Sequence, residues 1–217
     1  GVQISLSMTR LTIATTSRSA SGRSAHVRAK RERRRTEVLR AALRAFRRGG
    51  YHATTLDDIA LQLGVRKTAL YHYFPDKEAM LYACHREGLE EVAGIISAAR
   101  RRDSYVEQLA YAIREHVRVM TDTLEGSSLA FEVTALSARH QAEVIAARDR
   151  YEQALRDIVR RGIAAGEFRP VDAKLAVFAI LGAINWIARW YSPHGSVHPP
   201  ELGAQFADHL VRGLLTA

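Results

Sequence analysis

The chain has 217 residues, of which 47% are hydrophobic, and a formal net charge of +9. This length fits one or two globular domains, and the single cysteine, Cys84, excludes an intramolecular disulfide and a cysteine-based metal cage. A single cysteine also fits a reducing cytoplasm, where we expect the protein to reside. The longest apolar stretch, Ala176–Ala188, is too short to span a bilayer and predicts a buried helix.

The excess positive charge lies at the N-terminus. Residues 1–50 contain 13 Lys and Arg against 2 Asp and Glu, whereas the rest of the chain has a net charge of −2. Residues 1–27 are rich in Ser, Thr, Ala and Arg, and we expect them to form a disordered basic tail. The basic run Arg28–Arg35 suits contact with nucleic-acid phosphates and predicts salt-sensitive binding. A merely solubilising tail is the alternative.

The first predicted helix runs from Thr36 to about Arg48 and ends at Gly49–Gly50, after which Tyr51 is expected to pack back onto it. Its residues at helical spacing form one apolar stripe, consisting of Val38, Leu39, Ala42, Leu43 and Phe46.

Two short helices around Gly64 follow. Thr55 and Asp58 have the spacing of a capping box, and Gly64 can adopt the positive φ that ends a helix. The second helix is predicted from about Lys67 to Tyr73, because Pro75 cannot continue it. Such a pair presents one helix to the major groove and braces it with the other, which predicts DNA binding.

Beyond Asp76, which is placed to cap the next helix, the pattern is helical and predicts an all-α fold. The expected helices cover 76–100, 105–123, 129–137, 139–165, 171–191 and 201–215. The last two are apolar on more than one face, with small residues at Gly182–Ala183 and Gly203–Ala204. Such helices are buried on most sides, either in a dimer interface or in a monomer core.

The helix pair resembles the DNA-binding domain of the TetR family of bacterial transcriptional regulators. The residues that carry this resemblance are Phe46, Gly50–Tyr51, Thr54–Thr55, Ile59–Ala60, Gly64–Val65, Leu70–Phe74 and Lys77. It implies a helix-turn-helix domain over residues 28–78 and a helical effector-binding and dimerisation domain over residues 79–217, where the resemblance is only architectural. It also implies a homodimer that represses from a palindromic operator on the bacterial nucleoid.

By this resemblance, Tyr71 and His72 lie at the tip of the recognition helix, and Tyr73 and Lys77 match phosphate-contacting positions. The full expected DNA-binding set is Arg33, Arg34, Arg35, Thr54, Thr55, Lys67, Thr68, Tyr71, His72, Tyr73 and Lys77. Packing is an equal alternative for Tyr73, and capping alone is the alternative for Thr55.

The resemblance further implies a small-molecule effector among the C-terminal helices, where large aromatic and Met side chains can line an apolar pocket. The candidate ligand-binding residues are Tyr111, His116, Met120, Phe131, Phe178, Trp186, Arg189 and Trp190, although each also fits an ordinary core or surface position. The segment 185–195 resembles regulators that respond to acyl-CoA thioesters, for which Arg189, Arg148 and Arg139 would supply cations. A hydrophobic drug or an aromatic metabolite is the competing effector class.

No catalytic motif is evident. The nine histidines show no metal-ligand spacing on a well-placed helix, and a Gly-rich phosphate loop and a nucleophile elbow are both missing from the sequence. We therefore expect neither an enzyme nor a cofactor or metal requirement. An effector-independent DNA-binding protein and an activator are the remaining alternatives.

Overall fold

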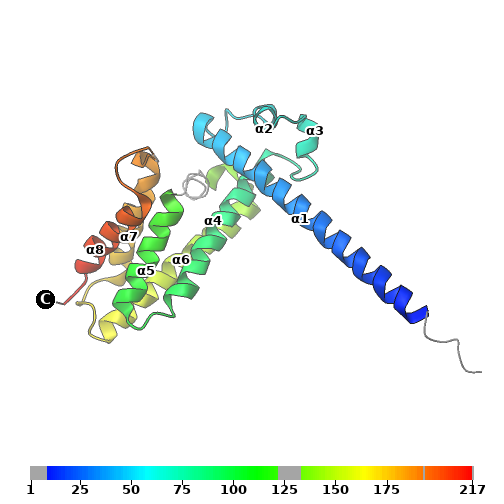
Figure 1. Cartoon of the computed structure of the whole chain (residues 1–217). Coiled ribbons are helices and arrows are strands. Elements are labelled where there is room, and N and C mark those ends of the chain that lie inside the picture. Colours follow the sequence, from blue (N-terminus) through cyan, green and yellow to red (C-terminus); the bar gives the residue numbers. More distant parts are fainter. Residues whose placement is uncertain (1–8, 122–132, 193, 217) are drawn as a thin grey trace, which may run out of the picture.

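The computed structural model describes residues 9–121, 133–192 and 194–216, with side chains from residue 24 onward. In these residues the regular structure is helical, which confirms the predicted all-α fold. At one end, α2 (Leu56–Gln62) packs on α1 (Thr9–Gly49), and α3 (Lys67–Leu70) packs on α2 (Figure 1). A bundle follows, made of α4 (Lys77–Ala99), α5 (Tyr105–Thr121), α6 (Ala138–Ala164), α7 (Ala173–Trp190) and α8 (Pro199–Arg212).

Helix α1 begins at Thr9, and its N-terminal half projects away from the other helices (Figure 1). For residues 9–27 the structure thus differs from the expected disorder, and α1 begins before the expected helix start at Thr36; residues 1–8 lie outside the described residues. The segment from Thr9 to Arg48 has no proline and is rich in Ala and Arg, which have high helix propensity. The N-terminal half of α1 therefore forms one continuous helix with the C-terminal half, which packs on the rest of the protein.

The local geometry of the helix pair follows its sequence signals. Thr55 caps α2, and its side chain and that of Asp58 form the predicted capping box. Gly64 has φ +61°, as the turn requires. Helix α3 is shorter than predicted, because it ends at Leu70 and residues 71–73 form a turn. In this turn the amides of Tyr73 and Phe74 both donate to the carbonyl oxygen of Leu70, and Pro75 prevents a further helical turn.

The bundle helices begin at side-chain caps. Asp76 accepts a hydrogen bond from the amide of Ala79 at 2.7 Å, Ser137 caps α6, and Asp172 accepts from two amides at the start of α7. Helix α8 starts at Pro199, before the predicted Glu201, because proline fits the first helical turn. The helix predicted over 129–137 is not seen in its described part, where Val133–Ala135 forms a 3-10 turn; residues 129–132 lie outside the described residues.

Two glycines allow close packing in the bundle. A Cβ atom on Gly162 would lie 2.2 Å from the ring of Phe168, and one on Gly203 would lie 3.2 Å from the carbonyl oxygen of Arg114. Gly203 therefore serves the contact between α8 and α5 within one chain. One continuous hydrophobic core runs from α1 through the bundle.

Candidate DNA-binding surface and effector cavity

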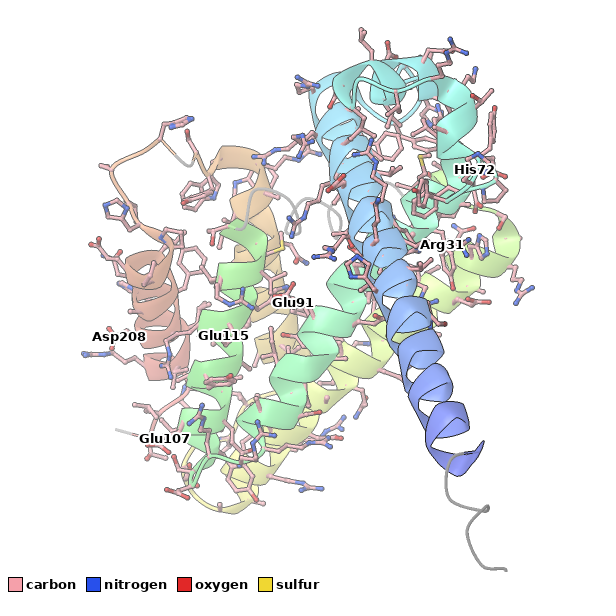
Figure 2. All side chains as sticks on the ribbon, turned by 45° about the vertical axis from the view of Figure 1, so that its right-hand side comes forward. Arg31, His72, Glu91, Glu107, Glu115 and Asp208 are labelled. Carbon is pink, nitrogen blue, oxygen red and sulfur yellow. The ribbon has the colours of Figure 1, made fainter. Side chains whose placement is uncertain are left out.

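The recognition surface is formed by α3 and the turn that follows it. Leu70 and Phe74 are buried and hold this segment on the core, as predicted. Thr68, Tyr71 and His72 face solvent, and the side chain of Tyr71 is 49% exposed. Figure 2 shows His72 at the outer edge of this unit. These three side chains are free to meet a groove.

Two predicted DNA contacts point into the protein instead. The hydroxyl of Thr54 is buried and donates to the carbonyl oxygens of Ala45 and Gly50, at 3.1 and 2.8 Å. The Lys77 ammonium group donates to the carbonyl oxygens of Tyr51 and of Thr54, both at 2.9 Å. It also lies 4.4 Å from the centre of the Tyr51 ring, which packs edge-on against Phe46. Both side chains thus fasten the connection between α1 and α2.

The remaining residues of the predicted set near α2 and α3 are exposed or half-buried. Thr55 is exposed and occupied in the cap of α2. The Lys67 ammonium group lies 3.0 Å from the carboxylate of Asp57, which ties α3 to α2. Exposed pairs of this kind contribute little stability and exchange easily with another anion. Tyr73 is half-buried and packs on the core.

The basic run lies on α1 rather than on an extended arm. Arg33 is exposed, and Arg34 pairs with Glu37 on the same helix at 2.5 Å. Arg35 turns inward, with its guanidinium group 3.8 Å from Glu87 of α4 and 4.8 Å from the centre of the Phe74 ring. Figure 2 shows Arg31 on this helix, on the same side of the molecule as His72.

A cavity of about 690 Å³ lies between α4 and α6. Its wall is mostly apolar, with charged groups at the rim. It is lined by Tyr82, Arg86, Leu89, Glu90, Ala93, Ile96, Glu143, Val144, Ala146, Ala147, Arg150, Tyr151 and Ala154. These lining residues are not among the ligand contacts predicted from the sequence. The signal was available, since four alanines on two facing helices leave space that larger side chains would fill.

One end of this cavity adjoins the root of the DNA-binding unit. The hydroxyl of Tyr82 donates to the carboxylate of Glu143 across the two helices, and the Tyr82 ring stacks on that of His140 at 3.8 Å. His140 Nδ1 lies 2.8 Å from a carboxylate oxygen of Glu78, which also accepts from the amide of Ser137 at 2.9 Å. This cluster joins the start of α6 to the start of α4.

Two histidines are buried in the bundle, His116 of α5 and His85 of α4. The Tyr151 hydroxyl lies 3.1 Å from His116 Nδ1 of α5. Burial lowers the pKa of His116 to about 4 and raises the pKa of Tyr151 well above its ordinary value. Burial, with a smaller contribution from Arg148, lowers the pKa of His85 to about 4 as well. All three groups are therefore neutral near pH 7.

None of the predicted ligand residues lines this cavity. His116 and Met120 of α5 are buried in the core, and Tyr111 is half-buried under the guanidinium group of Arg102. The predicted residues of α7 face outward, and they are Phe178, Trp186, Arg189 and Trp190. Phe131 lies outside the described residues. Phe178, Trp186 and Trp190 share the exposed face of α7. The other described candidates with uncharged side chains belong to α5, so the predicted set does not gather at one cavity.

The exposed residues of α7 form an apolar stripe. Leu175 is 65% exposed and Trp186 is 64% exposed, with Phe178 and Trp190 at about half. The opposite face of α7 packs against α5 and α6. The described part of the chain is thus an all-helical regulator with a helix-turn-helix head, a cavity in its bundle and an uncovered apolar stripe.

Comparison with known proteins agrees with this class. The family model described as bacterial regulatory proteins, tetR family, matches residues 38–84, and that described as tetracyclin repressor-like, C-terminal domain, matches residues 102–214. The HTH-type transcriptional repressor KstR2 of Mycolicibacterium smegmatis is 29% identical over 194 residues, which cover 83% of this chain and 90% of that protein.

Two solved structures are also similar. PfmR, a TetR family regulator from Thermus thermophilus, is 34% identical, with a TM-score of 0.76 over 82% of this chain and 99% of that one. AibR in complex with isovaleryl coenzyme A and operator DNA is 26% identical, with a TM-score of 0.74 over 84% of this chain and 98% of that one. The chain belongs to the TetR family of bacterial transcriptional regulators, and it is a DNA-binding regulator.

Proposed function

We propose that the chain is a homodimeric, cytoplasmic repressor, which leaves a palindromic operator when a small apolar effector enters the cavity between α4 and α6. The observation that carries this proposal is the position of the cavity. Its walls include α4, and the first residue of α4 is Lys77, which is bonded into the helix-turn-helix unit. A repressor name among the relatives supports the sign of regulation.

The apolar stripe on α7 supports dimerisation. By length and composition α7 also meets the requirements of a membrane span, but its other face packs against α5 and α6. A second copy can cover the stripe of Leu175, Phe178, Trp186 and Trp190 with its own α7, and large exposed apolar patches mark such interfaces. Helix α8 exposes mainly polar side chains, so α7 carries most of the apolar contact.

We infer two groups of DNA contacts. Tyr71, His72 and Thr68 reach base edges or phosphates from the recognition surface, and Lys67 and Arg33 meet phosphates. Support comes from their exposure and from the ease with which an exposed ion pair exchanges partners. Thr54 and Lys77 act on DNA binding only through the fold, because their polar groups are already occupied.

An acyl-CoA thioester is the effector class that we favour. The cavity wall offers apolar side chains for an acyl chain, and Arg86 and Arg150 lie at its rim, where phosphates of a coenzyme would reach them. These rim arginines replace Arg189, Arg148 and Arg139, the cations considered from sequence. The similarity to AibR, whose structure holds isovaleryl coenzyme A, supports the same class.

Release of DNA requires that the effector bind the two conformations of the dimer unequally. An acyl chain between α4 and α6 would separate Tyr82 from Glu143 and disturb the cluster of Glu78 and His140. Because α4 starts in the helix-turn-helix unit, a shift of α4 changes the spacing of the two recognition surfaces. Operator DNA must then weaken effector binding by the same factor.

Fluorescence anisotropy with the duplex upstream of the protein's own gene, against a scrambled duplex at physiological salt, tests this proposal. We expect tight binding to the first duplex alone, which one member of an acyl-CoA panel abolishes. Specific binding that no thioester changes would contradict the effector class. Equal, weak binding to both duplexes would contradict regulation from this operator.

A further inference from the structure

Two buried histidines of the bundle leave ring nitrogens without a hydrogen-bond partner. They are Nε2 of His116 and both ring nitrogens of His85. Within the residues that the structure describes, every other buried side-chain nitrogen or oxygen has a partner. An unpaired polar atom in the interior destabilises a fold, so its presence calls for an explanation, and a ligand that supplies the missing partner is one.

His116 is linked to the cavity through Tyr151. The Tyr151 side chain lines the cavity, and its hydroxyl lies 3.1 Å from His116 Nδ1. The two rings meet edge to face, with centres 5.3 Å apart and planes at 82°. If the hydroxyl donates to Nδ1, the Nε2–H group is an unused donor; if Nδ1–H donates to the hydroxyl, the hydroxyl proton is unused. Either tautomer leaves one donor of the pair unused, and Tyr151 is the member of the pair that lines the cavity.

The charge state of this pair selects among ligands. Burial lowers the pKa of His116 to about 4 and raises that of Tyr151, so both groups are neutral at physiological pH. Val144, Ala147 and Ala154, on the same helix as Tyr151, give the cavity wall an apolar part, and the neighbouring cation Arg150 is exposed at the rim. A carboxylate would lose its hydration opposite neutral donors, whereas a carbonyl oxygen loses far less.

We propose that the effector places a neutral carbonyl oxygen, such as that of a ketone or a thioester, against the Tyr151–His116 pair and accepts its unused hydrogen bond. This inference rests on the proposed function, in which the same cavity holds the effector. Tyr151 and His116 are then specificity-determining residues. A ligand of equal size without the carbonyl would bury the donor unpaired, which is how polar sites reject such analogues.

Calorimetric titration of the full-length protein tests this inference with four probes. They are decanoyl-CoA, S-decyl-CoA (the thioether in which a methylene replaces the carbonyl), undecan-2-one and decanoate. We expect the protein to bind decanoyl-CoA about tenfold more tightly than S-decyl-CoA, the ratio for one hydrogen bond. Tyr151→Phe and His116→Leu should each remove that preference, while Tyr191→Phe, away from the cavity, should keep it. Thermal melts establish that the variants fold. The comparison of the four probes on the unaltered protein tests the inference even if a variant does not fold.

The outcomes separate this inference from the proposed effector class. Equal affinity for decanoyl-CoA and S-decyl-CoA would overturn the carbonyl contact and leave the acyl-CoA class intact. Binding of undecan-2-one without either coenzyme compound would support the carbonyl contact and overturn the acyl-CoA class. Tighter binding of decanoate than of undecan-2-one would overturn the neutral site. Failure of all four probes to bind would overturn both proposals.

Discussion

In the helix-turn-helix unit, the Thr54 hydroxyl and the Lys77 ammonium group bond to backbone carbonyls, whereas within the bundle His85 and His116 leave three ring nitrogens unpaired. Satisfied buried polar groups hold one arrangement in place, and unsatisfied ones favour a second arrangement that pairs them. The comparison indicates that the helix-turn-helix unit, called the reading head below, is rigid and is joined to an adaptable effector domain. Helix α4 belongs to both regions, with Lys77 at its start and the cavity residues Leu89 and Ile96 further along it.

The effector domain also leaves the apolar stripe on α7 uncovered. A substitution in this stripe should have the largest effect on operator binding. Trp186→Glu should dissociate the dimer, because a charge would have to be buried in an apolar interface. Operator affinity should then fall about a hundredfold or more, since the second reading head no longer adds its contacts. Analytical ultracentrifugation and anisotropy measure the two effects. Ile145→Glu, at an exposed apolar residue of α6, is the matched control. A dimeric Trp186→Glu protein would contradict the interface.

Rigidity of the reading head depends on Lys77. Lys77→Met should lower the free energy of unfolding by about 2 kcal/mol, because it removes charge-assisted bonds to the Tyr51 and Thr54 carbonyls. Urea denaturation measures this loss. Lys67→Met, which removes an exposed ion pair, should leave stability unchanged. A stable Lys77→Met protein with a reduced salt dependence of DNA binding would instead show that Lys77 contacts phosphate.

The buried histidines of the effector domain predict a pH dependence. Burial lowers the pKa of His116 from 6.5 to about 4 in the folded state, so the unfolded chain binds the proton more readily. Stability is fully present above pH 6.5 and is lost as the pH falls towards 4. Between pH 7 and 5, His116 should account for a loss of about 2 kcal/mol. Urea denaturation at both pH values should show a smaller loss for His116→Leu, and an unchanged loss would sink the assignment.

The smallest expected effect concerns base recognition by the rigid head. Tyr71→Ala and His72→Ala should each lower the preference for operator over scrambled duplex by about tenfold, while the fold stays intact because both side chains are exposed. Arg33→Ala should weaken binding to both duplexes equally and reduce the salt dependence. Salt-dependent anisotropy distinguishes the two patterns. If Tyr71→Ala or His72→Ala weakened binding to both duplexes equally, as expected for Arg33→Ala, the substituted residue would contact phosphate alone.

Local chemistry made much of this molecule predictable from sequence. The capping box of Thr55 and Asp58, the positive φ of Gly64 and the cap at Asp76 were all readable, because each depends on neighbours within a few residues. Hydrophobic periodicity likewise predicted most bundle helices and the burial of Leu70 and Phe74. The concentration of positive charge in the first 50 residues and the helix pair together predicted a DNA-binding protein.

The tertiary structure decided where side chains of ambiguous type point. Lys77 and Thr54 are polar and stand at DNA-contacting positions of the pattern, yet the fold brings distant carbonyls to them. Large aromatic side chains such as those of Trp186 and Trp190 often line ligand pockets, but the orientation of α7 leaves both exposed on the surface of the bundle. The cavity arises from small alanines on α4 and α6, and a hollow depends on the packing of two helices distant in sequence. Sequence by itself therefore determined the helices, their ends and the class of protein, whereas packing alone determined which groups are left to meet DNA, effector or a second copy.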